Sequence, residues 1–214
     1  AAATTEVMAA CNLDKRTPEI PVGAGPEQQR EGTWSLDKTI YDTFGNTHTL
    51  RVNFTKRPGE ANRWNAEVLV DPELPGTTNT LADVGAVNAA GNTFIVEFSN
   101  LGTIAAVEDG QGDRLADGVL QVQVGFDVAG TTPQAGAQVR QNFNLTLGEV
   151  GSVVNSVTQF AEKSSTKAFK QNGYAMGYLE SFKIDQSGVI TGVYSNGSNR
   201  TLGQVALASF TNPG

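Results

Sequence analysis

The sequence predicts a mainly β protein with little helix. Short runs of alternating polar and apolar residues recur along the chain, and turn-forming Gly, Asn, Asp and Pro separate them, which is typical of half-buried strands. Glycine is frequent, with 24 residues, and only 17% of the residues are charged, so the sequence is poor in the Leu, Lys and Glu runs of long helices. A length of 214 residues suffices for one large or two modest domains.

Each predicted strand between residues 33 and 147 carries its apolar residues in one phase. The first three are joined by short turns and are expected to pair antiparallel, as at the start of a barrel or sandwich. The phases, in chain order, are Trp34, Leu36 and Ile40; Leu50, Val52 and Phe54; Trp64, Ala66, Val68 and Val70; Leu120, Val122, Val124 and Phe126; and Phe143, Leu145 and Leu147.

Other segments predict less regular structure. Residues 1–10 fit either a helix or an extended lead-in, and residues 17–31, with three prolines, predict a loop. A strand is expected at 93–98, a Gly- and Asp-rich loop at 101–116 and a connector at 148–170.

Residues 171–210 predict a three-stranded meander that belongs to a separate sheet. Two alternating runs, 180–184 and 188–194, flank a turn formed by Asp185 to Gly188, and a third apolar run follows at 202–210. If the first residues of the chain lie beside this second sheet, the larger β-domain is an insertion whose first and last strands are neighbours.

Charge argues against two classes of partner. The formal net charge is −7, and Lys and Arg are scattered, so we expect neither nucleic-acid binding nor attraction to an anionic membrane surface. No apolar stretch approaches the roughly 20 residues of a membrane-spanning helix. The chain begins Ala1-Ala2-Ala3 without a signal-peptide pattern, so we expect a fragment of a longer protein.

The sequence contains no pattern of an enzyme's active site, and we expect no cofactor and no metal centre. His48 is the only histidine, and a loop-bonding role at the end of a turn is the expectation for it. Asp109, Asp113 and Asp117 are spaced by four among glycines, but the terminal Glu of a calcium loop is missing, so a solvated loop is expected, with weak calcium binding as the alternative.

Cys11 is the one residue whose setting suggests reactivity. It is the only cysteine, and its neighbours Asn12, Asp14, Lys15 and Arg16 are polar. A structural cysteine usually lies in an apolar strand, so the polar setting suggests an exposed and available thiol, while an incidental half-buried thiol is the default expectation from the residues alone.

Several motifs give the chain a resemblance to bacterial flagellar hook proteins of the spirochaete type. Gln171-Asn172-Gly173-Tyr174 with Gly177 and Leu179, Tyr194-Ser195-Asn196-Gly197, and Leu202-Gly203-Gln204-Val205-Ala206-Leu207-Ala208 are similar to family motifs, as are Thr158-Gln159-Phe160 and the turn from Tyr41 to His48. The resemblance covers the chain from about residue 33 to its end. Distal rod proteins share part of these motifs and are the nearest alternative.

The resemblance implies an outer β-barrel-like domain inserted into a second, smaller β-domain. Residues 1–9 would be the lead-in from the inner domain, 10–170 the outer domain, and 171–214 part of the inner domain. It also implies a structural role in motility: identical subunits self-assemble into a helical homopolymer, a curved tube that acts as a universal joint, with other axial flagellar proteins at its ends. The location would be the flagellar hook, outside the cytoplasm and periplasmic in a spirochaete, after export without a cleaved signal peptide.

The resemblance gives Cys11 and Asn12 a role, because they match the Cys-Asn pair of spirochaete hook proteins, whose subunits become joined by lysinoalanine. Asn12 would orient the backbone carbonyl or stabilise the enolate-like transition state as a donor. Thr166 is a further candidate, because the segment that leaves the domain would bring Ser165, Thr166 and Lys167 near Cys11. In the family the attacking lysine lies upstream of the cysteine in the sequence and comes from a neighbouring subunit. No Lys precedes Cys11 here, so we expect that lysine to lie outside these 214 residues. The alternative of a different class is a secreted carbohydrate- or host-binding β-domain, which would need Trp34 or Trp64 exposed beside a cleft.

Overall fold

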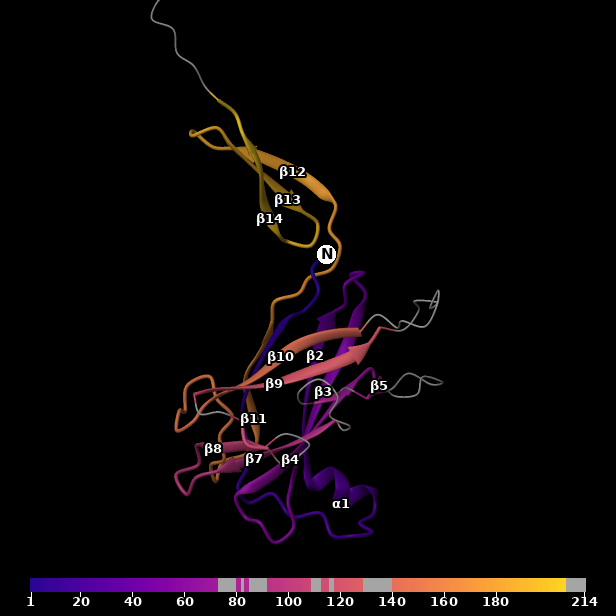
Figure 1. The fold of residues 1–214 in the computed structure, drawn as a ribbon, viewed down its shortest axis with the longest axis vertical. Helices are drawn as coiled ribbons and strands as arrows, with labels where there is room; N and C mark the ends of the chain where they lie inside the picture. The colour runs from indigo at the N-terminus through magenta and orange to yellow at the C-terminus, as the bar shows by residue number, and fades with distance from the viewer. Residues whose placement is uncertain are drawn as a thin grey trace, which may run out of the picture.

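The computed structural model describes residues 1–72, 80–81, 83–84, 92–108, 113–115, 118–128 and 140–206. These form an elongated molecule with a large β body at one end and a small three-stranded sheet at the other (Figure 1). The N-terminus lies where the two parts meet (Figure 1). The prediction of a mainly β fold with little helix is confirmed.

The first large sheet brings the two ends of the large body together. Its order is β11-β1-β10-β9-β6, and β1 pairs antiparallel with β11 and parallel with β10. The strand that enters the body therefore lies beside the strand that leaves it, as expected for an inserted domain. The strands are β1 (Glu6–Asn12), β6 (Asp83–Val84), β9 (Val119–Asp127), β10 (Arg140–Glu149) and β11 (Ser165–Gln171).

The second large sheet is an antiparallel meander with the order β2-β3-β4-β7-β8, and β5 also pairs with β4. Its strands are β2 (Thr33–Tyr41), β3 (Thr47–Lys56), β4 (Arg63–Val70), β5 (Thr80–Leu81), β7 (Thr93–Phe98) and β8 (Ile104–Glu108). Neither strand order returns to its first strand within the described residues, so the expected barrel-like domain is built from two open sheets.

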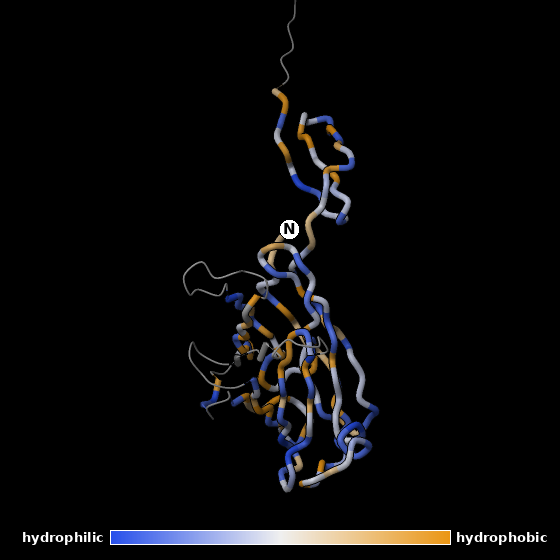
Figure 2. Tube along the Cα trace, turned by 90° about the vertical axis from the view of Figure 1, so that its right-hand side faces the viewer, coloured by the Kyte–Doolittle hydropathy of each residue, from blue (hydrophilic) through white to orange (hydrophobic). Residues whose placement is uncertain are grey.

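One hydrophobic core joins the two large sheets. The predicted apolar phases point into it, and among its bulkiest fully buried side chains are Phe54, Trp64, Phe126 and Phe143. The hydropathy-coloured trace shows apolar segments running through the large body (Figure 2). The alternating apolar residues of each strand therefore lie on the face that is buried against the facing sheet.

Three local predictions were wrong. The loop expected at 17–31 contains a short helix, α1 (Pro26–Glu31), which begins with proline at its first turn. The loop expected at 101–116 contains β8, and the connector expected at 148–170 contains all of β11 except its last residue. Residues 1–10, which fitted a helix or an extended lead-in, contribute most of strand β1.

The predicted meander at the C-terminal end is confirmed as a separate sheet with the order β12-β13-β14, but its third strand begins at Asn199 and not at Leu202. Its strands are β12 (Leu179–Ile184), β13 (Val189–Tyr194) and β14 (Asn199–Gln204), and residues 207–214 lie outside the described part of the chain. Several of its apolar side chains are exposed, with 62% of Phe182 and 55% of Ile184 accessible, whereas those of β13 are half-buried, and the core of the large body takes no residue from this sheet. Within the described residues, no helix is long and apolar enough to cross a membrane.

Candidate functional site

Cys11 lies near the end of β1, next to β11, the strand that comes first in the order of the first large sheet, and has no exposed surface. The interpretation of Cys11 as an exposed thiol is therefore wrong, since its side chain joins the core cluster and its backbone lies between β11 and Thr158. A register shift follows Ala10, so that Ala10 pairs with Ala168 but Cys11 pairs with Thr166. The extra residue in β11 at this bulge is Lys167.

Burial makes the Cys11 thiol a weak acid. Loss of solvation raises its pKa from 9.0 to about 12, and the positive charge of Lys167 opposes this only in part. The thiolate is the nucleophilic form of cysteine, so Cys11 stays protonated and unreactive at neutral pH in the isolated chain.

The backbone carbonyl of Cys11 accepts two hydrogen bonds from one residue. Thr158 donates its backbone N–H at 2.8 Å and its hydroxyl at 3.3 Å. Lys167 Nζ donates to the Thr158 hydroxyl oxygen at 3.0 Å and lies 5.7 Å from the centre of the Phe160 ring. The Lys167 ammonium is therefore connected to the Cys11 carbonyl through the Thr158 hydroxyl.

The side chain of Asn12 links β1 to the connector (residues 148–170) by hydrogen bonds. Its Nδ2 donates to the carbonyl of Glu162 at 3.0 Å, while its Oδ1 accepts from the Phe160 backbone N–H at 3.0 Å and from the Thr158 hydroxyl at 3.1 Å. This buried side chain is thus satisfied by the 158–162 segment. In this structure Asn12 Nδ2 is directed to Glu162 and not to the Cys11 carbonyl.

Thr166 is brought beside Cys11 as expected, because the two are partners in the β1–β11 register. Its side chain is exposed, and its hydroxyl makes no hydrogen bond to any described residue. Thr166 is therefore a neighbour of Cys11 in the sheet, but the hydrogen bonds to the Cys11 carbonyl come from Thr158.

Thr158 was missed from the sequence as a residue of the site, whereas Lys167 was expected near Cys11 together with Ser165 and Thr166. Thr158 belongs to the Thr-Gln-Phe motif that was interpreted only as a connector. The structure places all three of its residues in contact with the body: Thr158 contacts β1, Gln159 accepts a buried hydrogen bond from Trp64 Nε1 at 2.6 Å, and the Phe160 N–H binds Asn12. A polar motif with this many buried contacts signals a docked segment.

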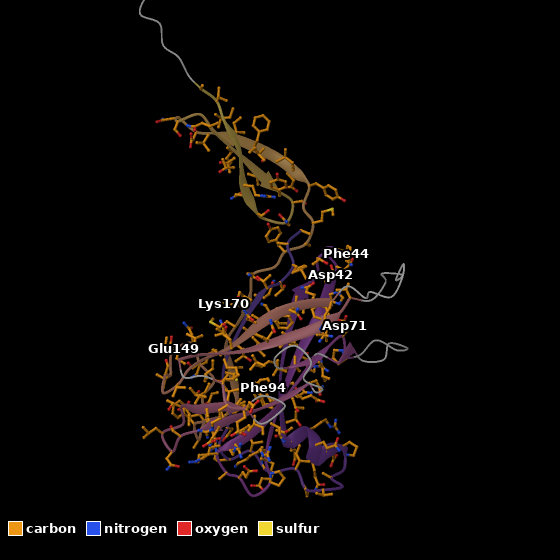
Figure 3. The ribbon with its side chains drawn as sticks, viewed as in Figure 1. Asp42, Phe44, Asp71, Phe94, Glu149 and Lys170 are labelled. Carbon is orange, nitrogen blue, oxygen red and sulfur yellow. The ribbon has the colours of Figure 1, made fainter. Side chains whose placement is uncertain are left out.

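His48 has the loop-bonding role expected for it. Its Nδ1 lies 2.6 Å from Asp71 Oδ2, and its Nε2 lies 3.3 Å from Asp42 Oδ2. The two carboxylates lie on the same side of the large body (Figure 3). Burial would raise the pKa of Asp42, but hydrogen bonds from Asn46, His48 and the Phe44 backbone outweigh it and hold that pKa below its usual range.

Within the described residues, the positions proposed for calcium or carbohydrate binding show no comparable cluster of functional side chains. Asp109 and Asp117 lie outside the described residues, and no group of three metal-ligating side chains occurs in the part of the chain that the structure describes. Trp64 has no exposed surface, and Trp34 is half-buried against the core, at the edge of a shallow hollow that it shares with Arg30 and Lys163.

Comparison with known proteins gives a family match over most of the chain. Residues 12–174 match the family model described as flagellar basal body protein FlaE D2 domain. The flagellar hook protein FlgE of Treponema pallidum is 51% identical over 99% of this chain and 46% of its own length. That of Borreliella burgdorferi is 44% identical over the whole chain and 44% of its own length. The chain therefore spans about half the length of these relatives.

A solved structure shows a more distant likeness. The crystal structure of the Helicobacter pylori flagellar hook protein FlgE2 matches 85% of this chain and 34% of its own chain, with a TM-score of 0.48 and 16% sequence identity.

Proposed function

The chain belongs to the flagellar hook protein family, and we propose that it is the central, outward-projecting part of a hook subunit. The observation that carries this proposal is the similarity to two spirochaete hook proteins over practically the whole chain. The role is structural. Many copies assemble into a helical homopolymer, a flexible curved tube that links the motor to the filament as a universal joint.

The two-part architecture supports a division into an outer and an inner domain. Residues 10–170 are the outer domain, residues 1–9 lead into it, and residues 171–214 are part of the inner domain. Because β1 pairs with β11, the outer domain is connected to the inner domain through two neighbouring strands. The exposed Phe182 and Ile184 of the small sheet are expected to be covered by the rest of the inner domain, because large apolar side chains are rarely left in water in clusters.

The assembly we propose uses head-to-tail contacts between identical subunits, which give an open helix rather than a closed ring. Other axial flagellar proteins contact the two ends of the tube. The location is the hook, outside the cytoplasm and in the periplasm of a spirochaete, reached without a cleaved signal peptide.

Covalent joining of neighbouring subunits through Cys11 is the finer part of the proposal. A base removes the α-hydrogen of Cys11, the C–S electron pair leaves with sulfur, and dehydroalanine remains. The neutral amine of a lysine from the neighbouring subunit then adds to the β-carbon, and a proton returns to the α-carbon. Overall one cysteine and one lysine give lysinoalanine and hydrogen sulfide, so no oxidant is needed.

The burial of Cys11 implies that this reaction waits for assembly. With no exposed surface on Cys11, an incoming lysine reaches the β-carbon only after a covering segment moves. Residues 160–162 are the candidate, since the Asn12 side chain holds them to β1 by two separable hydrogen bonds, to the Glu162 carbonyl and from the Phe160 N–H. Contact with a neighbouring subunit would supply the free energy for this movement.

The test of the hook assignment is complementation of a hook-deficient strain with the full-length gene. Electron microscopy of isolated flagella should show hooks, and antibodies against the large β body should label the outside of the hook. Labelling of the basal body below the hook would instead indicate a distal rod protein. Secretion of the protein without any axial structure would favour the carbohydrate- or host-binding alternative.

A further inference from the structure

The backbone carbonyl of Cys11 has the surroundings of a site that stabilises developing negative charge. Loss of the α-hydrogen moves charge onto this carbonyl oxygen, which becomes enolate-like as the elimination proceeds. The oxygen already faces the N–H and the hydroxyl of Thr158, and the hydroxyl accepts a hydrogen bond from the ammonium of Lys167. Preorganised donors aimed at a developing oxyanion are a large term in enzymic rate enhancement.

We propose that Thr158 and Lys167 promote the elimination step at Cys11, Thr158 by direct donation to its carbonyl oxygen and Lys167 as a positioning residue that acts through the Thr158 hydroxyl. This inference rests on the crosslinking reaction proposed above. It assigns the oxyanion contact to Thr158 rather than to the side chain of Asn12 or Thr166.

The lengths of the contacts favour the transition state over the ground state. The Thr158 hydroxyl has one hydrogen, which it shares between the Cys11 carbonyl at 3.3 Å and Asn12 Oδ1 at 3.1 Å. The bond to the carbonyl is long, and therefore weak, while the carbonyl is neutral. As negative charge grows on that oxygen, the hydrogen shifts toward it and the bond strengthens, and only such a gain lowers the barrier.

Lys167 is held in the orientation that this role requires. Its ammonium donates to the Thr158 oxygen, which leaves the hydroxyl hydrogen free for an acceptor, and the face of Phe160 holds the cation from another side. The bulge in β11 is what places Lys167 here, since Ala168 pairs with Ala10 and Thr166 pairs with Cys11. The positive charge of Lys167 also lowers the pKa of the Cys11 thiol and so stabilises the anionic sulfur that leaves in the elimination.

The test measures the rate of lysinoalanine formation and of sulfide release in polymers of full-length protein. Lys167→Met keeps the apolar stem and removes the charge, and should slow both rates about ten- to hundredfold. Thr158→Val should do the same. Lys167→Arg and Thr158→Ser should restore most of the rate, because they keep the cation and the hydroxyl. Lys170→Met, on the same strand, is the matched control and should leave the rate unchanged.

A second measurement separates the elimination step from docking of the neighbour. Dehydroalanine installed chemically at position 11 in the unfolded protein, followed by refolding and assembly, bypasses the elimination. Lys167→Met polymers should then crosslink at the wild-type rate, whereas an equally slow rate would overturn the proposal. A wild-type rate for Lys167→Met with native Cys11 would also overturn it. If wild-type polymers form no lysinoalanine at all, the crosslinking function itself is wrong.

Discussion

The carbonyl oxygen of Cys11 accepts two hydrogen bonds from Thr158, one from its backbone N–H at 2.8 Å and one from its hydroxyl at 3.3 Å. This relationship joins β1 to the segment that follows β10, across 147 residues of sequence. It fixes the cysteine backbone while the thiol stays buried in the core. The structure thus combines a prearranged carbonyl with a protected side chain.

The first prediction concerns the protection of the Cys11 thiol in the unassembled protein. Because burial raises its pKa from 9.0 to about 12 and removes its exposed surface, alkylation by iodoacetamide at pH 8 should be at least about a hundredfold slower than in urea. Thr166→Cys in a Cys11→Ala background provides the control, since position 166 is exposed and should react rapidly in the native protein. Equal rates for the two cysteines would contradict the buried site.

The second prediction concerns the turn held by Asp42. This buried carboxylate accepts hydrogen bonds from the backbone of Phe44 and Asn46 and from the side chains of Asn46 and His48. Asp42→Asn replaces one accepting oxygen with an NH₂ group, so the free energy of unfolding should fall by about 2–4 kcal/mol. Denaturant unfolding at pH 7 measures it, with the exposed Glu27→Gln as the control.

The difference in stability between the wild type and Asp42→Asn should also depend on pH, and the direction of this dependence follows from the pKa of Asp42. The pKa of Asp42 is lower in the folded than in the unfolded chain, so its stabilising contribution is present above the unfolded pKa and disappears as pH falls through the folded value. The difference in stability between wild type and Asp42→Asn should therefore shrink as the pH is lowered below about 4. A difference that grows in acid would show that the carboxylate is not favoured in the folded state.

The third prediction concerns Gly148, which sets up the loop leading to Thr158. Its φ is +120°, and a Cβ there would lie 2.6 Å from the Cα of Ser156, so Gly148→Ala should destabilise the protein by more than about 2 kcal/mol. Gly151→Ala is the control. Its φ is also positive, at +75°, but no atom lies within 4 Å, so only about 1 kcal/mol of backbone strain is expected. Equal losses in thermal unfolding would contradict the contact.

Strands with strict alternation could be predicted because burial of one face dictates their pattern. Phe143, Leu145 and Leu147 of β10 are an example, and all three are buried. Strand β8 was missed because its buried residues do not alternate strictly. Strand β1 was left ambiguous because small residues such as Ala9 and Ala10 fit a helix equally well.

The exposure of Cys11 was misjudged for a different reason. Its polar neighbour Asn12 suggested a solvated segment, but Asn12 is buried because the connector satisfies its amide. That pairing joins residues about 150 positions apart, and no local pattern encodes it. The proximity of Thr166 and Lys167 to Cys11 could be predicted because it follows from topology, whereas the contact of Lys167 with Thr158 depends on a β-bulge that no local pattern shows.

The central claim is that this chain forms part of a hook subunit whose copies become covalently joined through Cys11. The most direct measurement compares hooks isolated from cells that carry the wild-type or the Cys11→Ala full-length gene, by heating in SDS and by mass spectrometry. Both proteins should form hooks. Wild-type hooks should resist dissociation and yield a peptide with lysinoalanine at position 11, while Cys11→Ala hooks should separate into monomers. Cys11→Ala hooks that resist dissociation as the wild type does would contradict the claim.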